Sequence, residues 1–257
     1  MSWIAGMYLG DGSIKVNKEG RTLTLKVRDK ELVEEAAMKL AIVMGRDKPY
    51  FVGRLSDGRY YVQVRSRELA DHLLNKENTL NYLKKRPREF IRAFFDCEGF
   101  VFGAVCGKGA FTSKIGASNT DRELLVLIRD KLMDLGIRMK ITRSFSAGRV
   151  IVTSRGRTVA RKDCYVLYTT RSSDLIRFYR KIGFSIKRKM DKLRDIVYIR
   201  QNFKGKRAAI EWIRRYEYRR GEGRTRWFRR EKPLSLEDAL KEYKRLTLRG
   251  LTGTTID

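Results

Sequence analysis

Two short apolar segments, each ending in an acid followed by glycine, constrain the fold of this chain most. Residues 3–12 read Trp-Ile-Ala-Gly-Met-Tyr-Leu-Gly-Asp-Gly, and residues 90–99 read Phe-Ile-Arg-Ala-Phe-Phe-Asp-Cys-Glu-Gly. Both segments are too short to span a membrane. Small residues stand four positions apart in each segment and so share one helical face; they are Gly6 and Gly10 in the first, and Ala93 and Cys97 in the second. The pattern predicts two helices whose backbones approach closely along these small residues.

Such packing would bring the two closing acids, Asp11 and Glu98, to the same end of the helix pair. The C-terminal end of a helix carries partial negative charge, which adds to the attraction of the carboxylates for a cation. Carboxylate oxygens are good ligands for hard divalent metals. The two segments therefore predict a divalent-metal site. The alternative is a pair of buried apolar helices with acidic ends and no metal.

The stretches that follow the two acids repeat one order of hairpins and helices. In the first half, hairpin patterns alternate with helix starts near Asp29 and Ser66. In the second half, Asp121-Arg-Glu-Leu repeats Asp29-Lys-Glu-Leu, and Ser172-Ser-Asp-Leu repeats Ser66-Arg-Glu-Leu. Each half therefore reads αββαββα. The second half carries extra, arginine-rich residues between about 147 and 163, which predict a loop on a phosphate backbone.

This arrangement resembles the LAGLIDADG homing endonucleases in their single-chain, two-motif form of the archaeal intron-encoded type. Residues 4–12 match the family motif well, including its frequent Gly-Asp-Gly ending. In residues 91–99, Arg92 replaces the usual alanine, Ala93 replaces the first glycine, and Cys97 replaces the small residue before the acid. Because the second copy keeps its acid and closing glycine, these changes bear on helix packing more than on metal chemistry.

The resemblance covers about residues 2–195. It implies an α+β fold of two pseudo-symmetric αββαββα repeats with saddle-shaped antiparallel sheets, followed by a basic, partly helical C-terminal extension. The predicted domains are residues 1–80 for the first repeat, 81–195 for the second repeat and 196–257 for the extension. The extension mixes arginines with aromatic residues such as Trp212. Docking of this segment onto the body and direct contact with DNA are both compatible with that pattern.

The charge of the chain points to a polyanionic partner. Lys and Arg number 58 against 30 Asp and Glu, which gives a formal net charge of +28. Repulsion among so many positive charges lowers folding stability, and binding to a polyanion is the usual reason for a protein to retain such a net charge. The basic residues are spread along the whole chain, which favours a large nucleic-acid footprint over a membrane surface. No segment has the length of a membrane span or the pattern of a secretory signal.

Cysteine and histidine are too sparse for several classes of protein. The three cysteines form no C-x-x-C pair, which argues against a disulfide framework and for a reducing, cytoplasmic location. The single histidine, His72, excludes zinc fingers, zinc deaminases and histidine-dependent nucleases, all of which need more ligands at fixed spacing. Metal chemistry on carboxylates remains.

The predicted strands alternate apolar residues with long polar side chains. A twisted two-stranded ribbon can enter the major groove, where such side chains read base edges. The alternative is an ordinary solvated face of a sheet. The candidate DNA-binding residues are Lys15, Thr22, Thr24, Lys26, Arg28, Arg59, Tyr61, Gln63 and Arg65 in the first half, and Lys114, Asn119, Arg138, Lys140, Thr142, Arg149, Arg155 and Arg157 in the second.

The resemblance implies site-specific hydrolysis of both strands of a long, asymmetric duplex DNA site. Asp11 and Glu98 would each hold Mg²⁺, with the backbone carbonyls of Gly10 and Cys97 as further ligands. We expect Mn²⁺ to substitute, and Ca²⁺ to bind without supporting efficient cleavage. Family proteins place a basic or amide residue near each centre, and Arg28 occupies that position in the first half. A plain phosphate contact is the alternative role for Arg28.

Double-stranded DNA is the expected partner, bound by a monomer, since one chain supplies both repeats. Two alternatives use the same fold. An RNA-splicing maturase would need the basic surface but not the acids, and its partner would be RNA. A DNA-binding regulator would have lost cleavage. Retention of both Asp11 and Glu98 argues against pure loss of catalysis.

Overall fold

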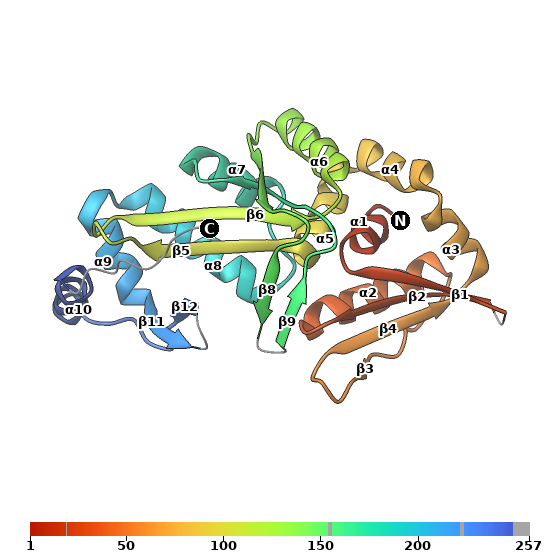
Figure 1. The fold of residues 1–257 in the computed structure, drawn as a ribbon, viewed down its shortest axis with the longest axis horizontal. Helices are drawn as coiled ribbons and strands as arrows, with labels where there is room; N and C mark the ends of the chain where they lie inside the picture. Colours follow the sequence, from red (N-terminus) through yellow and green to blue (C-terminus); the bar gives the residue numbers. More distant parts are fainter. Residues whose placement is uncertain (19, 154–155, 222–223, 249–257) are drawn as a thin grey trace.

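Two helices, α1 (Ser2–Gly10) and α5 (Pro87–Glu98), lie side by side between two four-stranded sheets (Figure 1). The structure is a computed structural model, and it describes residues 1–18, 20–153, 156–221 and 224–248. Glycines let the two helices approach closely. A Cβ added at Gly6 would overlap the carbonyl oxygen of Phe90, and one added at Gly10 would lie 2.5 Å from the Cβ of Cys97. The predicted packing along small residues is confirmed at these two positions.

Arg92 faces away from this close contact. Its Nε donates to the carbonyl oxygen of Ile182 at 2.7 Å, so it ties α5 to a later part of the chain. Ala93 is fully buried within the core. The departures of the second motif from the family pattern are therefore compatible with tight helix packing.

The first repeat folds into an antiparallel sheet with helices on its apolar side. The sheet has the strand order β1-β2-β4-β3. Its strands are β1 (Gly12–Asn17), β2 (Gly20–Val27), β3 (Gly53–Arg54) and β4 (Tyr60–Arg65), and its helices are α2 (Lys30–Val43), α3 (Arg67–Leu74) and α4 (Lys76–Lys85). Leu23, Leu25 and Val62 are almost fully buried, which places one side of the sheet against the core.

The second repeat has the same order of elements, and the predicted α+β fold of two pseudo-symmetric halves is confirmed. Its main sheet has the strand order β5-β6-β10-β7. The strands are β5 (Gly99–Val105), β6 (Phe111–Asn119), β7 (Lys140–Phe145) and β10 (Cys164–Thr169), and the helices are α6 (Arg122–Asp134) and α7 (Ser172–Lys181).

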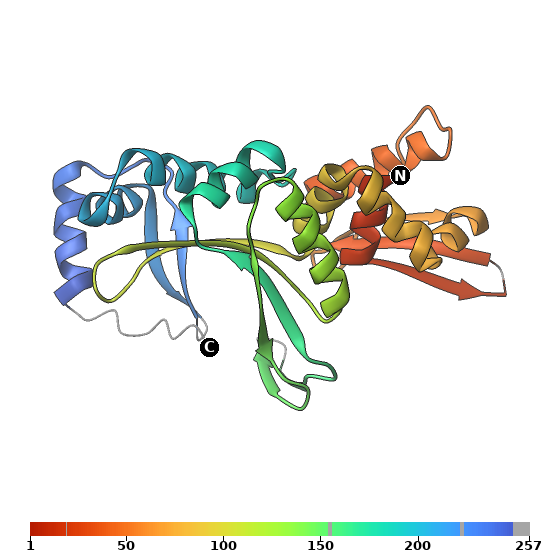
Figure 2. The same cartoon turned by 90° about the horizontal axis from the view of Figure 1, so that it is seen from above.

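The extra residues of the second half form a β-hairpin rather than the predicted loop. The hairpin pairs β8 (Val150–Thr153) with β9 (Gly156–Val159), and Val150 lies opposite Val159. β-Branched residues favour strands because their side chains pack well on a pleated surface. Figure 2 shows this hairpin extending away from the side of the molecule that carries α7.

Local signals cap two of the four predicted helix starts, while Asp29 and Ser172 make no capping hydrogen bond. The side chains of Ser66 and Asp121 accept hydrogen bonds from backbone N–H groups three residues on, at 3.1 and 2.9 Å. Asp29 precedes α2, but its carboxylate caps no backbone group. It instead accepts two hydrogen bonds from Arg188, each of 2.7 Å. Asp29 therefore makes a tertiary contact with α8 instead of capping α2. A guanidinium that donates two hydrogen bonds is a stronger partner for a carboxylate than a backbone N–H group.

The C-terminal part of the chain comprises α8 (Lys187–Asn202), α9 (Gly205–Arg215), the hairpin β11 (Tyr216–Gly221) and β12 (Arg224–Arg229), and α10 (Leu236–Leu248). Helix α8 crosses the predicted boundary at residue 196, because Ile196 and Ile199 continue its buried face. The division into three domains stays a prediction.

Trp212 docks this part of the chain onto the second sheet. Its ring is fully buried and stacks on that of Tyr216, with centroids 3.8 Å apart. A Cβ added at Gly103 of β5 would lie 2.5 Å from the Trp212 ring, and Phe111 of β6 lies 5.2 Å away between centroids. The aromatic residues of the extension therefore complete the core, and a DNA contact by its arginines stays a prediction.

Ion pairs hold several of these arginines on the protein. Arg215 donates to Glu211 at 2.8 Å, and Arg229 donates to Asp191 at 3.1 Å.

No helix in the described part of the chain combines the length and the apolar character that a membrane span requires. The three cysteines are free thiols.

Candidate active site at the helix ends

Asp11 and Glu98 lie together where the two central helices end, as the sequence predicts. Asp11 follows the last residue of α1, and Glu98 is the last residue of α5. A Cβ added at Gly10 would lie 3.7 Å from the Cγ of Glu98, which shows how close the two helix ends are. The Cys97 thiol donates to the carbonyl oxygen of Met7 at 3.8 Å across the same contact.

The surroundings of both acids disfavour their charged forms. Burial, and then the negative charge of Asp11, raise the pKa of Glu98 to about 7. Burial also raises the pKa of Asp11, and the nearby Asp29 carboxylate adds to this effect. Two neighbouring carboxylates that repel each other gain most from a cation placed between or beside them. The raised pKa values are therefore typical of a metal site or a catalytic site.

Lys189 is a buried cation beside the two acids, and sequence reasoning missed it. Its side chain comes from the first turn of α8, and its positive charge lowers the pKa of both Asp11 and Glu98. Burial lowers the pKa of Lys189 itself. No pattern near the motifs points to this residue, because α8 is separated from α5 by the whole second sheet in the sequence.

Asp96 fixes the chain that leads into α8. This carboxylate is 1 % exposed and accepts hydrogen bonds from the backbone N–H groups of Ser185 and Ile186 at 3.0 and 3.4 Å. Burial raises the pKa of Asp96 to about 6, although these hydrogen bonds oppose the shift. Asp96 thus links α5 to the start of α8, and Lys189 lies in the first turn of that helix.

Asn119 also contacts the site directly. Its amide Nδ2 donates to Oε1 of Glu98 at 3.2 Å, and its Oδ1 accepts from the backbone N–H of Asp121 at 2.8 Å. The sequence singled out Asn119 for DNA binding, and the structure places it against the acid. Arg28 is exposed at the end of β2, so a role beside the first centre stays a prediction.

The donor set fits a hard divalent cation whose coordination is completed by other oxygen ligands. Among the described residues, no three His, Cys, Asp or Glu side chains gather closely enough to hold a metal ion. Asp11 and Glu98 would therefore need backbone carbonyls, water or phosphate oxygens as partners, which hard cations accept. Gly10 and Cys97 directly precede the acids, and burial raises the pKa of the Cys97 thiol, so Cys97 would offer its carbonyl oxygen.

Strand register places most of the predicted DNA-binding side chains on one face of each sheet. Residues directly opposite each other on paired strands share a face. In the first sheet, Lys15 lies opposite Thr22, Thr22 opposite Arg65, Thr24 opposite Gln63, and Lys26 opposite Tyr61. In the second, Lys114 lies opposite Phe102, Lys140 opposite Tyr168, and Thr142 opposite Val166.

The other candidates lie at the margins of these sheets. Arg59 is in the turn before β4, where its Nε donates to Asp57 at 2.7 Å. Arg138 lies in the loop before β7, one residue ahead of Met139, and Arg149 and Arg157 belong to the β8–β9 hairpin. Arg155 lies outside the described residues.

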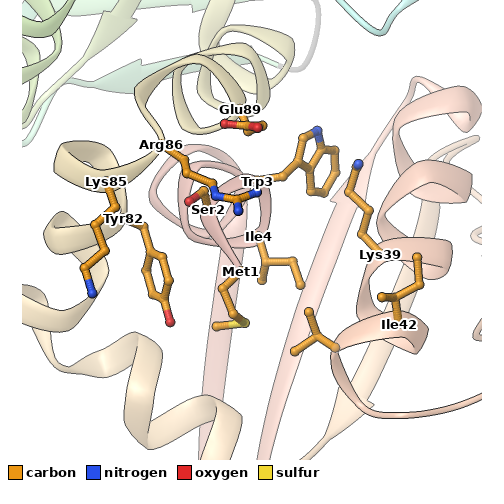
Figure 3. A pocket seen from close by; sticks show the side chains of 11 residues that line it. Met1, Ser2, Trp3, Ile4, Lys39, Ile42, Tyr82, Lys85, Arg86 and Glu89 are labelled. Atoms are coloured by element: carbon orange, nitrogen blue, oxygen red, sulfur yellow. The ribbon is translucent and has the colours of Figure 1, made fainter.

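A pocket of about 480 Å³ opens at the opposite end of the helix pair (Figure 3). Met1, Trp3 and Ile42 line it, together with Lys39 and Arg86. The Nζ of Lys39 lies 5.5 Å from the centroid of the Trp3 ring. Because α1 separates this pocket from Asp11, it takes no part in the site at the acids.

Comparisons with known proteins agree with this architecture. The family model described as a LAGLIDADG-like domain matches residues 86–183. The uncharacterized protein MJ0398 of Methanocaldococcus jannaschii is 30% identical over 202 residues, which cover 77% of this chain and 71% of that protein. The chain belongs to the LAGLIDADG family.

Two solved structures of homing endonucleases are also similar to this LAGLIDADG protein. I-DmoI in complex with DNA and Mn is 16% identical with a TM-score of 0.47, over 70% of this chain and 94% of that chain. The meganuclease I-SmaMI bound to uncleaveable DNA is 13% identical with a TM-score of 0.45, over 78% of this chain and 91% of that chain.

Proposed function

We propose that this LAGLIDADG protein is a homing endonuclease of the intron-encoded type that cuts both strands of a long, asymmetric duplex DNA site with a divalent metal. The observation that carries the proposal is the convergence of Asp11 and Glu98 at the ends of two packed helices. An apolar helix pair needs no acids at this place, and burial raises the pKa of both carboxyl groups.

Asp11 and Glu98 would hold Mg²⁺, together with the carbonyls of Gly10 and Cys97. When bound, Mg²⁺ would polarise the scissile phosphate and lower the pKa of an attacking water. Mn²⁺ would substitute for it, and Ca²⁺ would bind without efficient cleavage. Lys189 offsets the negative charge of the two acids, and the Asn119 amide orients the Glu98 carboxylate. Arg28 would assist at the first centre.

The two sheets would lie along the DNA, with their polar faces in its grooves. One chain carries both sheets, so a monomer suffices for a complete site. The net charge of +28 supplies attraction to the phosphate backbone. The two repeats differ in sequence at equivalent positions, which supports an asymmetric target.

The test is incubation of the protein with a library of long duplex DNA and Mg²⁺, followed by sequencing of the cut ends. We expect a single preferred site with breaks in both strands. Asp11→Asn serves as the matched inactive control. Tight binding to duplex without cuts would favour the regulator, and preference for structured RNA over duplex would favour the maturase.

A further inference from the structure

The exposed faces of the two four-stranded sheets differ in chemistry. In the first sheet, Thr24 lies opposite both Ser13 and Gln63, so the three side chains share the face that points away from the core. The Nε2 of Gln63 donates to Oγ1 of Thr24 at 3.2 Å. Together with Lys15 and Lys26, this face offers hydrogen-bond donors and acceptors along its length.

The same face of the second sheet carries three aromatic rings at its centre, with Lys140 and Thr142 on its edge strand β7. Phe102 lies opposite Lys114, while Phe100 and Tyr168 both lie opposite Gly116, which places these side chains on one face. The three aromatic rings are partly exposed. Residues of the other face, such as Ile115, are fully buried.

The rings lie low across the middle of this sheet. A Cβ added at Gly116 would lie 2.9 Å from Cζ of Phe100 and 2.9 Å from Cβ of Tyr168, so the glycine leaves the space that the rings occupy. The Nζ of Lys114 lies 4.1 Å from the centroid of Tyr168 and 6.0 Å from that of Phe100. Lys114 is thus held over the rings as part of the same cluster.

Equivalent positions in the two repeats carry this difference. Phe100 stands two residues after Glu98, where the first repeat has Ser13 two residues after Asp11. One strand position further on the same face, Phe102 corresponds to Lys15. The contrast therefore belongs to the surface beside each acid rather than to an unrelated part of the sheet.

The β8–β9 hairpin carries an exposed apolar face of its own. Val150, Val152 and Val159 are 55%, 63% and 57% exposed. Val150 lies opposite Val159, and Val152 lies opposite Arg157, so the three valines and the arginine share one face of the hairpin. This arm leaves the edge of the second sheet and extends away from α7 (Figure 2). Exposed apolar side chains beside a cation suit a partner with both methyl groups and phosphates.

We infer that the second repeat reads its half of the DNA site through the 5-methyl groups of thymines, whereas the first repeat reads its half through hydrogen bonds. The inference rests on the proposed function. Phenylalanine and valine cannot hydrogen-bond to base edges, and apolar contact with the thymine methyl is the readout open to them in the major groove. Lys114 and Arg157 supply the charge that holds the phosphates nearby.

The test replaces thymine with uracil, which removes the methyl group and keeps every hydrogen-bonding group. A duplex selected for binding from a randomised library is resynthesised with uracil in one half at a time, and Kd is measured at fixed salt. We expect Kd to rise roughly fourfold for each contacted thymine in the second half, the transfer free energy of one methyl group. Uracil in the first half should leave Kd unchanged.

Photocrosslinking assigns each half of the site to a sheet. Thymines replaced by 5-bromouracil in the second half should crosslink to peptides that contain Phe100, Phe102 or Tyr168. The variant Phe102→Ala should lose sensitivity to uracil at one position, whereas Lys15→Ala, at the equivalent position of the first repeat, should keep it. Circular dichroism of both variants checks that they fold.

The inference is overturned if uracil leaves Kd unchanged in both halves, or if the selected site has no thymine under the second sheet. The proposed function stands in either case. Absence of duplex binding overturns both. The comparison of thymine with uracil uses the unaltered protein, so it decides the question even where a variant fails to fold.

Discussion

The Nζ of Lys189 lies 2.6 Å from the backbone oxygen of Asp96, to which it donates a hydrogen bond. A second hydrogen bond, of 3.2 Å, runs from the same Nζ to the carbonyl oxygen of Phe95. These are carbonyls of the last turn of α5, which ends at Glu98, so the lysine both caps the helix and places a positive charge beside the acids. A residue of α8 is in this way built into the site formed by α1 and α5.

We expect Lys189→Met to slow DNA cleavage by roughly 100-fold or more, the usual range for a positioned charged group. Lys189 lowers the pKa of both acids, so its loss should also move the pH dependence of cleavage toward higher pH. The matched control is Lys192→Met on the same helix. Lys192 lies 5.8 Å from the Trp212 and Tyr216 ring centroids, and its pKa shift does not involve the acids.

Cleavage rates and pH profiles of the two variants are compared on one DNA substrate. A Lys189→Met protein with the wild-type rate and pH profile would show that the lysine serves only to cap α5.

Replacement of either acid by its neutral isostere should abolish double-strand cleavage. Asp11→Asn and Glu98→Gln keep side-chain size but remove the charge that would hold the metal, so site-specific binding should persist. Binding is measured by gel shift in Ca²⁺, and cleavage in Mg²⁺. Glu237→Gln, on the exposed face of α10, is the control and should cut normally. Cutting of both strands at the wild-type rate by either active-site variant would make the assignment wrong.

Without metal and DNA, the charge of Glu98 should cost stability as pH rises. The pKa of Glu98 is raised from 4.5 to about 7, so the folded state binds more protons than the unfolded state between these values. The free energy of unfolding should therefore fall across this window as the carboxylate ionises. The measurement is Tm from pH 4 to pH 8 for wild type and Glu98→Gln.

The difference between the two curves isolates Glu98 from other titrating groups, including Asp96, whose pKa is also raised. Glu98→Gln should decline less over this range, and Mg²⁺ should restore part of the wild-type stability at pH 7. Parallel curves would show that Glu98 is as well solvated in the fold as in the unfolded chain.

Trp212→Ala should destabilise the protein by about 3–5 kcal/mol, the cost of removing a large aromatic side chain from a packed core. The Trp212 side chain is fully buried, with 0 % of the residue exposed, and its ring stacks on that of Tyr216. Urea unfolding gives the measurement. Phe51→Ala is the control, because Phe51 is 79% exposed and its loss should change stability by about 0.5 kcal/mol or less. Equal effects would mean that the extension is not part of the core.

Binding to duplex DNA should depend strongly on salt. Contacts with six or more phosphates imply a slope of log K against log salt steeper than about −5. The slope is measured between low and moderate KCl on a fixed duplex, with a structured RNA of equal length as the comparison. A slope near −1 on the duplex, with tighter binding to the RNA, would favour the maturase.

Local sequence determined the motif helices, the strands of the two main sheets and the place of the two acids, whereas the β8–β9 hairpin was predicted as a loop. The small residues of the motif helices decide how closely α1 and α5 can pack, and Asp11 and Glu98 follow because each closes its helix. Helix starts at Ser66 and Asp121 and the alternating faces of the strands are likewise local, since they depend on neighbours within a few residues.

Tertiary structure decided which residues support the acids. Lys189 and Asp96 meet across a long stretch of chain. Asn119 lies on the core face of β6 with Ile115 and Ala117, and it reaches Glu98 because β6 ends beside α5. The same holds for Trp212, whose burial requires the glycine at position 103 of another element. Such contacts have no periodic signature in the sequence, because long-range packing pairs residues by their place in space rather than by their spacing along the chain.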